Sequence, residues 1–475
     1  MADLQYTAVD GGKCVGTNEP NTRRVHLYTS VAILNIIYVI LGTTFTWSSP
    51  MLIKLQLSGA DASTVASGLT VGGMVGPFMS GMLMDRLGRK GTAVIAMGLV
   101  TSSYTLLTFT RTVWILAAGR FLGGMSFAIT FSAVPTYVAE ISEDSVRGVL
   151  NTLNMISIAS GGLLMFSVAP FVSYRLIHYI MLGICAMFFL LCPLLPESPY
   201  TLVMKNRIGK AKHVLTWLRE KRPESVVETE LQIIQKAVAE SEAESSSVVD
   251  LFTSRGSRRA FTTCCVLFAL QQLAGITVIV YYLQTIFEMT GAAISSSTSS
   301  TVVGAIKFWA GFACPLAVKN FGYKKPLIVS ALGAALGMGG LGVFFSLKLN
   351  GFEVHHLNWL PIMSVIVYMS FFIAGFANIP WAMSGELFAT NVKPIATCLL
   401  TVLSSFFAFL MTKLFPNMIQ LFGLDYLFLA CSFFNFATAA FVAFSVKDTC
   451  GLSFLEIQEL MSGRKRADIL LHRAQ

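Results

Sequence analysis

Apolar runs of roughly twenty residues alternate with short polar segments along nearly the whole chain. A run of about 20 residues in a helix matches the thickness of a bilayer's hydrocarbon core. We count twelve such spans, near residues 27–47, 62–84, 91–110, 112–139, 148–170, 174–195, 259–287, 298–318, 326–347, 358–384, 394–419 and 425–446. Short alternating strands, which would indicate a barrel, do not recur. The pattern therefore predicts an all-α polytopic membrane protein.

The long polar interruption of this pattern covers residues 196–258. Within it, Lys210–Arg222 and Val226–Ala243 place apolar residues at helical spacing among charged ones, which predicts short surface helices. We therefore expect four regions. These are a six-helix bundle with a short N-terminus (1–195), a helical linker (196–258), a second six-helix bundle (259–446) and a tail (447–475).

Basic residues determine the expected orientation. Lys and Arg gather in the linker, in the tail and in alternate short loops, while the other loops hold few. By the positive-inside rule both termini and the linker are cytoplasmic, and we expect a plasma-membrane location. Only 12% of residues are charged, against about 25% in a soluble protein, and the net charge of +9 follows from topology rather than from a nucleic-acid partner. The cysteines lack metal-ligand spacing, so we expect neither a metal nor a cofactor.

The two bundles share local motifs, which indicates an internal repeat. The loop Gly81–Lys90 combines glycine with Asp85, Arg86, Arg89 and Lys90, and a second glycine loop lies around Gly322. Seven residues separate an acid from a base at the end of the fourth span of each half, Glu140 from Arg147 and Glu386 from Lys393. The segment Pro196-Glu197-Ser198 has a counterpart in Lys447-Asp448-Thr449. Two similar bundles around a central cleft can rock about a site near the membrane midplane.

These motifs and several others occur in an order that resembles the sugar porters of the major facilitator superfamily. Tyr200, where most members have Arg, resembles the branch of insect facilitated trehalose and hexose transporters. The other motifs that carry the resemblance are Gly119-Arg120-Phe121, Pro135-x-Tyr137-x-x-Glu140-Ile141, Pro196-Glu197-Ser198-Pro199, Gln271-Gln272-x-x-Gly275, Tyr281-Tyr282, Ile379-Pro380-Trp381 and Asp448-Thr449-x-Gly451. The resemblance implies a major facilitator fold that alternates between outward-open and inward-open states.

The resemblance also implies gating residues, most of them in cytoplasmic charge clusters that hold the bundles together when the cleft faces outward. Carried over residue by residue, they are Asp85, Arg86, Arg89, Arg120, Glu140, Arg147, Glu386 and Lys393. The second glycine loop departs from the family pattern, since it reads Lys319-Asn320-Phe321-Gly322-Tyr323-Lys324 and lacks the acid. We therefore expect the second-half gate to be weaker or differently connected.

A sugar site needs amide side chains for hydroxyls and an aromatic face for the ring. Gln271 and Gln272 supply adjacent amides on the seventh span, and a break near Gly275 would let them face different sides of a crevice. Their alternative role is to bridge neighbouring helices. Trp381, after Pro380, is expected to form a cavity floor, with ordinary apolar packing as its alternative.

Several positions differ from those of a typical hexose carrier. Thr277, Met155 and Ser404 replace or lie near family amides, and Ile373 replaces an acid. Lys307 lies in mid-span, where a lysine raises the free energy of inserting the helix into the membrane by roughly 3 kcal/mol. Its side chain should therefore face a cavity or a partner rather than reach the membrane surface. We expect Lys307 to shape substrate choice.

The source of energy follows from an absent acid. Proton-coupled members carry an Asp in the first span opposite the arginine that corresponds to Arg120, whereas no Asp or Glu occurs here between Pro20 and Ala60 and Thr44 lies near that position. A proton relay needs a titratable group. We therefore predict a monomeric uniporter for trehalose or a hexose and no enzyme activity. The alternatives are a carrier of an anionic or amphipathic solute and a non-transporting sugar sensor.

Overall fold

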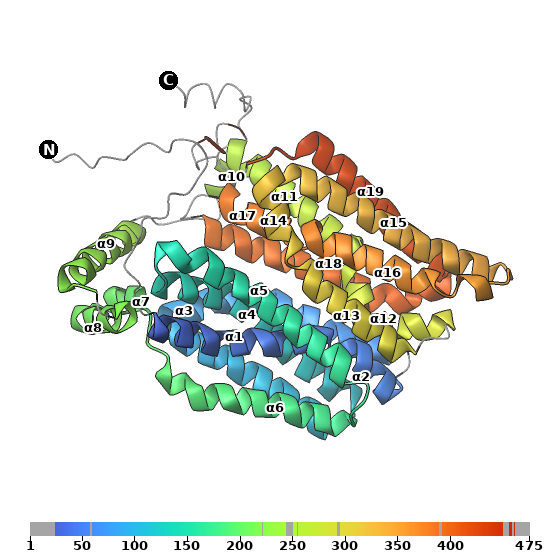
Figure 1. Ribbon diagram of the computed structural model, residues 1–475, viewed down its shortest axis with the longest axis horizontal. Coiled ribbons are helices and arrows are strands. Elements are labelled where there is room, and N and C mark those ends of the chain that lie inside the picture. Colours follow the sequence, from blue (N-terminus) through green and yellow to red (C-terminus); the bar gives the residue numbers. More distant parts are fainter. Residues whose placement is uncertain are drawn as a thin grey trace.

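The computed structural model describes residues 24–57, 59–220, 222–243, 250–253, 255–291, 295–388, 392–449, 456–457 and 460. Helices make up nearly all of these residues, and no strand occurs among them (Figure 1). Residues 1–23, the predicted short N-terminus, lie outside the described residues. So does most of the predicted tail (447–475), of which only 447–449, 456–457 and 460 are described.

Long helices form the body of the molecule and shorter ones the connections. The first half consists of α1 (Val25–Thr46), α2 (Ser48–Leu55), α3 (Gly59–Phe109), α4 (Val113–Ile141), α5 (Asp144–Val168) and α6 (Tyr174–Leu191). The linker contains α7 (Pro199–Met204), α8 (Ile208–Arg219), α9 (Glu224–Ala243) and α10 (Asp250–Thr253). The second half consists of α11 (Arg255–Leu273), α12 (Ile276–Thr290), α13 (Ser296–Ala310), α14 (Ala313–Phe321), α15 (Lys324–Leu349), α16 (Leu360–Phe371), α17 (Ile379–Leu387), α18 (Lys393–Phe422) and α19 (Leu424–Ser445).

Eleven described helical segments are long and apolar enough to cross a membrane, and one of them makes two passes. The helix α3 has 51 residues, with Gly88 at its middle in a left-handed conformation (φ 86°). A side chain at Gly123 of α4 would touch both Leu69 and Ser103. In a straight helix these two would lie about 50 Å apart, so the chain turns back at Gly88. The twelve predicted passes are thereby accounted for.

Three passes of the second half are broken rather than continuous. Gly275 adopts φ 92° between α11 and α12, so the break considered there in the sequence analysis is present. A π-helical turn, Phe372–Phe376, separates α16 from α17, whose first turn contains Pro380. The third break lies at Gly311 and Phe312, between α13 and α14. Broken helices expose backbone carbonyls, and proteins tolerate these in a membrane only inside protein or beside a cavity.

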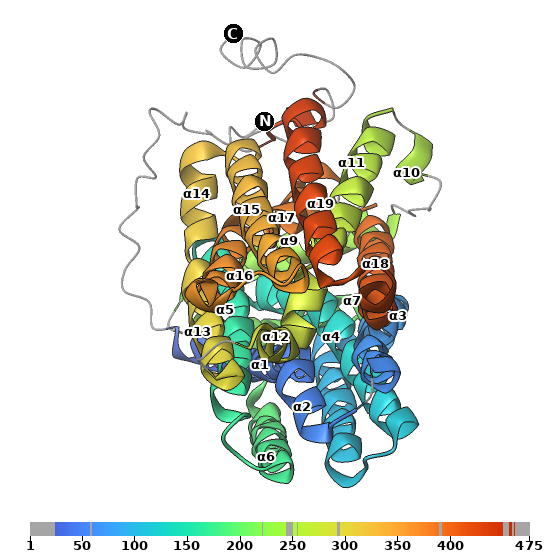
Figure 2. The same cartoon turned by 90° about the vertical axis from the view of Figure 1, so that its right-hand side faces the viewer.

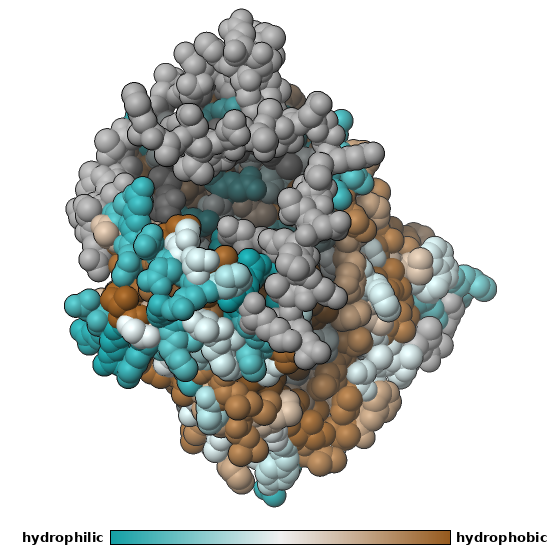
Figure 3. Space-filling model, turned by 60° about the vertical axis from the view of Figure 1, so that its left-hand side comes forward, coloured by the Kyte–Doolittle hydropathy of each residue, from teal (hydrophilic) through white to brown (hydrophobic). Residues whose placement is uncertain are grey.

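The two halves lie side by side, with α7, α8 and α9 at one end of the long helices (Figures 1 and 2). We call this the linker end and the opposite end, near α2 and the start of α6, the far end. Viewed from the linker end, the linker helices form a hydrophilic surface beside a broad hydrophobic one, as expected where a protein leaves the membrane (Figure 3).

Buried charges attach the linker to the first half. Arg219, at the end of α8, is almost fully buried; one N–H donates to the carbonyl of Ile141 over 2.9 Å, and others donate to Glu230 at 2.5–3.2 Å. Glu143 accepts from Arg24 at 2.6 Å and pairs with Arg222 at 3.2 Å. The region boundaries predicted at residues 195 and 259 stay a prediction.

Candidate functional site

The break at Gly275 brings three polar side chains together in the second half. Gln272, at the end of α11, donates from Nε2 to Ser404 Oγ of α18 over 3.0 Å. Thr277, after the break, donates to Gln272 Oε1 over 2.6 Å. The backbone angle of Gly275 (φ 92°) favours glycine, and an added side chain would lie 2.9 Å from Met338 Cε. A solute hydroxyl can exchange partners with this amide and these two hydroxyls.

Gln271 points elsewhere. Its Nε2 donates to the carbonyls of Phe376 (2.7 Å) and Ala377 (3.1 Å), at the junction of the π-helical turn with α17, where Pro380 has no N–H for the carbonyl of Phe376. This is the helix-bridging alternative considered for it. Of the two adjacent glutamines, Gln272 therefore has the better position for a solute.

Lys307 approaches the other half of the molecule. Its Nζ lies 5.5 Å from the ring centre of Phe45 on α1, a distance at which a cation is attracted to an aromatic face. Phe45 also contacts Phe127 of α4 and Tyr281 of α12, with ring centres 5.7 and 5.5 Å apart. The predicted cavity-facing lysine thus lies against an aromatic cluster shared by both halves. The sequence singled out Lys307, but no local signal distinguished Phe45 from other apolar residues.

Arg120 lies apart from the other predicted gating residues, toward the far end. It is fully buried, and its guanidinium donates to the carbonyl of Thr44 (2.5 Å) and to Ser48 Oγ (3.1 Å). The same group lies over the rings of Trp47 and Tyr281. A carbonyl, a hydroxyl and two ring faces take the place of a carboxylate, because a buried cation needs partners. Arg120, on α4, therefore connects α1, α2 and α12.

The remaining two predicted substrate residues have different surroundings. Trp381, half-buried on α17, packs edge-on against Phe268, with ring centres 4.5 Å apart. Met155 is 46% exposed on α5. Two residues further on, Ser157 donates to Asn35 of α1 over 2.8 Å. The roles predicted for Trp381 and Met155 stay predictions.

The first-half cluster at the linker end is built around the turn at Gly88. Arg89 donates from Nε and Nη2 to one oxygen of Glu140, over 3.0 and 2.8 Å. Glu197, after the last helix of this half, accepts the backbone N–H groups of Arg89 and Lys90 over 3.0 and 3.2 Å. A carboxylate at the start of a helix is favourable because the N–H groups there are unpaired.

The second-half cluster repeats this plan with a different donor. Tyr323 follows Gly322 (φ 72°), and its hydroxyl donates to Glu386 over 2.5 Å. Asp448, after the last helix of this half, accepts the backbone N–H of Tyr323 over 3.2 Å. In this cluster a phenol takes the place that the guanidinium of Arg89 has in the first half. Sequence reasoning did not single out Tyr323, although its position directly after Gly322 matches that of Arg89 after Gly88.

The other predicted gating residues flank these clusters. Asp85 and Arg86 are exposed, and the carbonyl of Arg86 accepts Lys205 over 3.1 Å. Arg147 lies in the first turn of α5. Lys393, exposed at the start of α18, leans toward Gly385, beside Glu386.

Three hydrogen bonds between described residues of the two halves lie toward the far end. Gln284 donates its N–H to Ser49 Oγ over 3.1 Å, Thr301 donates to the carbonyl of Phe166 over 3.0 Å, and Lys413 donates to Thr64 over 2.7 Å. The pairs Arg89–Glu140 and Tyr323–Glu386 at the linker end each stay within one half. The structure therefore represents a state that is closed at its far end.

Twelve passes in two bundles, with a polar site beside a broken helix, define a secondary transporter of the major facilitator type. The chain belongs to the family described as "Sugar (and other) transporter", whose model matches residues 22–461. In the described residues no group of three or more His, Cys, Asp or Glu could hold a metal ion.

Curated relatives include insect proteins named facilitated trehalose transporter Tret1. The one from Polypedilum vanderplanki is 28% identical over 470 residues, which cover 96% of this chain and 93% of that protein. The one from Aedes aegypti is also 28% identical over 96% of this chain, but the match covers only 58% of that protein. The chain thus spans little more than half the length of several of these relatives.

Solved structures confirm the fold. The xylose transporter XylE from E. coli, in a partially occluded inward-open conformation, aligns with a TM-score of 0.76 at 20% identity, covering 90% of this chain and 99% of that one. The proton:xylose symporter XylE bound to 6-bromo-6-deoxy-D-glucose aligns with a TM-score of 0.70 at 19% identity, covering 92% and 99%.

Proposed function

We propose that this protein carries trehalose or a hexose through a membrane by facilitated diffusion. The observation that supports it most directly is the group of Gln272, Thr277 and Ser404 beside the break at Gly275. These donors and acceptors suit sugar hydroxyls, and the break lets Gln272 and Thr277 move with different parts of the helix. The names of the insect relatives suggest trehalose as the first solute to test.

The proposed uniport follows from the surroundings of Arg120. A carbonyl and a hydroxyl accept hydrogen bonds from its guanidinium, and α1 carries no carboxylate that could exchange a proton there. Transport should therefore depend on the sugar gradient alone. We further propose that the linker end is cytoplasmic and that the membrane is the plasma membrane, because the linker and the loops beside it carry most of the basic residues.

The experiment is uptake of labelled trehalose and glucose into proteoliposomes at two external pH values. We expect saturable uptake of one sugar that an imposed proton gradient leaves unchanged. Accumulation above equilibrium, driven by the proton gradient, would contradict uniport. Sugar binding without uptake would favour the sensor instead.

A second candidate function follows from Lys307, whose described neighbour is an aromatic ring rather than a carboxylate. A cation beside aromatic faces suits an anionic or amphipathic solute. Lys307→Gln should change relative uptake of neutral and acidic sugars, whereas Lys348→Gln, at the end of α15, should not. An unchanged substrate range in Lys307→Gln would remove both this candidate and the predicted role of Lys307.

A further inference from the structure

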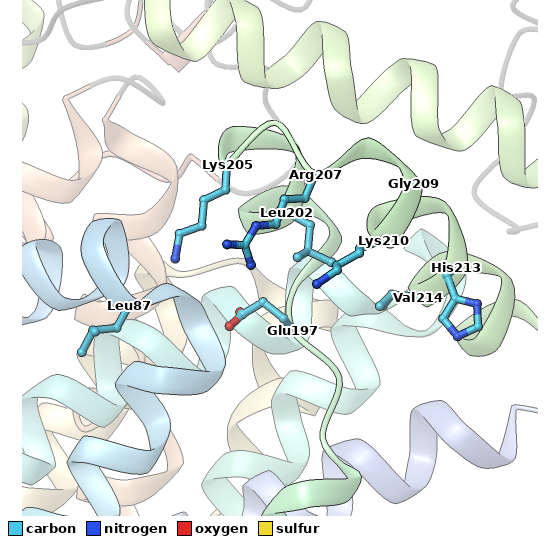
Figure 4. Close-up of a pocket in the computed structure, with 9 residues that line it drawn as sticks. All are labelled: Leu87, Glu197, Leu202, Lys205, Arg207, Gly209, Lys210, His213 and Val214. Carbon is cyan, nitrogen blue, oxygen red and sulfur yellow. The ribbon is translucent and has the colours of Figure 1, made fainter.

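A cavity of about 590 Å³ lies between the linker and the end of the first pass of α3 (Figure 4). It is separate from the central site, and none of the transport residues discussed above explains it. Its lining residues are Leu87, Glu197, Leu202, Lys205, Arg207, Gly209, Lys210, His213 and Val214. A volume of this size accommodates a small organic ligand.

Three cations dominate the cavity. Lys205, Arg207 and Lys210 are exposed, and Figure 4 shows the charged ends of Arg207 and Lys210 directed toward the space above Glu197. The ammonium of Lys205 donates to the carbonyl of Arg86, which neutralises no charge.

The single acid of the lining is already engaged. One oxygen of Glu197 accepts three backbone N–H groups, those of Arg89, Lys90 and Ser198, over 3.0–3.2 Å. No ion pair joins Glu197 to a lining cation within the part of the chain that the structure describes. The cavity therefore keeps an excess of positive charge.

The start of α8 adds backbone donors to these side chains. Arg207 occupies the N-cap position and makes no side-chain cap, so the first N–H groups of α8 lack that partner. Gly209, in this first turn, has open space where a side chain would be. The positive end of a helix dipole, free N–H groups and flanking basic side chains together form a typical binding arrangement for phosphate.

We propose that this cavity binds a phosphate-bearing polyanion, seated on the first turn of α8 and held by Lys205, Arg207 and Lys210. The phosphate can belong to a lipid headgroup or to a soluble phosphate ester. Leu87, 44% exposed beside the cavity, ends a pass of α3 whose Phe78 and Met82 are also exposed, so the cavity opens near the membrane boundary.

The test measures binding to the purified full chain. The probes are inositol 1,4,5-trisphosphate in solution and nanodiscs containing either phosphatidylinositol 4,5-bisphosphate or phosphatidylcholine alone. In the variant Lys205→Ala/Arg207→Ala/Lys210→Ala we expect the dissociation constants for inositol 1,4,5-trisphosphate and for the phosphatidylinositol 4,5-bisphosphate nanodiscs to be at least tenfold higher. Tighter binding of the lipid than of the soluble ester identifies a headgroup as the source of the phosphate, and the reverse identifies a soluble ester.

Two further variants separate this site from general charge attraction. Lys236→Ala/Arg258→Ala/Lys319→Ala removes three exposed cations elsewhere and should leave binding unchanged. Gly209→Leu keeps every charge, favours the helix and fills the open space, so it should weaken binding as strongly as the triple variant. Equal loss in both triple variants, full binding in Gly209→Leu, or no binding by the unmodified chain would each overturn the proposal.

Discussion

The two charge clusters at the linker end share one backbone plan but differ in their donors. In both, a glycine with positive φ reverses the chain, and an acid from beyond the last helix of that half caps the next helix. In the first half Arg89 then donates two charged N–H groups to Glu140, whereas in the second half the phenol of Tyr323 donates to Glu386. The repeat therefore preserves the turn and the cap, while the charge of the donor varies.

This difference should make the two halves unequal partners in gating. The stability of an ion pair between largely buried groups depends strongly on both charges. A phenol supplies a hydrogen bond but no positive charge, so the negative charge of its carboxylate partner is not compensated. Arg89 and Glu140 are only 13% and 11% exposed, while Glu386 is exposed. We therefore expect the first half to be a rigid unit and Glu386 to be freer to exchange partners.

Neutralising the acid of each cluster should give the largest contrast. Glu140→Gln leaves the charge of Arg89 buried without its counterion, so we expect a loss of about 3 kcal/mol in the free energy of unfolding. Glu386→Gln should lower the free energy of unfolding by only about 1 kcal/mol, because the exposed amide oxygen can still accept the hydrogen bond from the Tyr323 hydroxyl. Equilibrium unfolding of the purified variants in mixed detergents measures both. Equal losses would contradict the proposed asymmetry.

Alanine in place of either turn glycine should destabilise the protein, but by different amounts. An added Cβ would lie 2.2 Å from Asp448 Oδ2 at Gly322 and 2.8 Å from Glu197 Oε2 at Gly88, and both φ angles are positive. We expect Gly322→Ala and Gly88→Ala to destabilise the protein by about 1–3 kcal/mol, with Gly322→Ala the more severe. Gly98→Ala is the matched control, because its Cβ would meet open space. A neutral result at Gly322 would show that the turn relaxes easily.

Removing the phenolic hydroxyl tests the second-half connection itself. Tyr323→Phe should cost about 1 kcal/mol, since one hydrogen bond to a partly exposed carboxylate is lost. Tyr323→Arg should restore or exceed the original stability by supplying guanidinium donors to Glu386. Tyr179→Phe, which removes an exposed hydroxyl from α6, should change nothing measurable. The same unfolding measurement applies, and a destabilised Tyr323→Arg variant would argue against equivalence of the two clusters.

The smallest expected effect concerns the linker attached to the first half. Hydrogen bonds from Lys212 lower the pKa of Glu224 below its ordinary value. Because the folded-state pKa is lowered, the contact between α8 and α9 is stabilised above the unfolded pKa of Glu224 and loses this stabilisation as pH falls through the lowered value. Hydrogen exchange of α8 and α9 should therefore quicken slightly in acid, relative to the intrinsic exchange rate. In Lys212→Met this additional response should disappear, while exchange in α15 stays the same.

Much of this architecture was predictable, because its signals are local. Hydropathy runs indicated the spans, and the seven-residue separation of Glu140 from Arg147 recurred between Glu386 and Lys393. The sequence also offered Gly275 as the place of a possible break, and glycine tolerates the positive φ found there. Each of these features depends on residues near one another in the chain.

Only the tertiary structure decided which side chains meet. It directed Gln271 to the carbonyls of a π-helical turn, placed Arg120 at the far end and put Phe45 beneath Lys307. Such contacts join residues about 75 to 260 positions apart, and many phenylalanines or carbonyls in the sequence are locally equivalent partners. The sequence by itself therefore determined where the helices run and turn. Packing of the whole chain selected their partners, because a buried polar group must be satisfied by whatever the fold brings within reach.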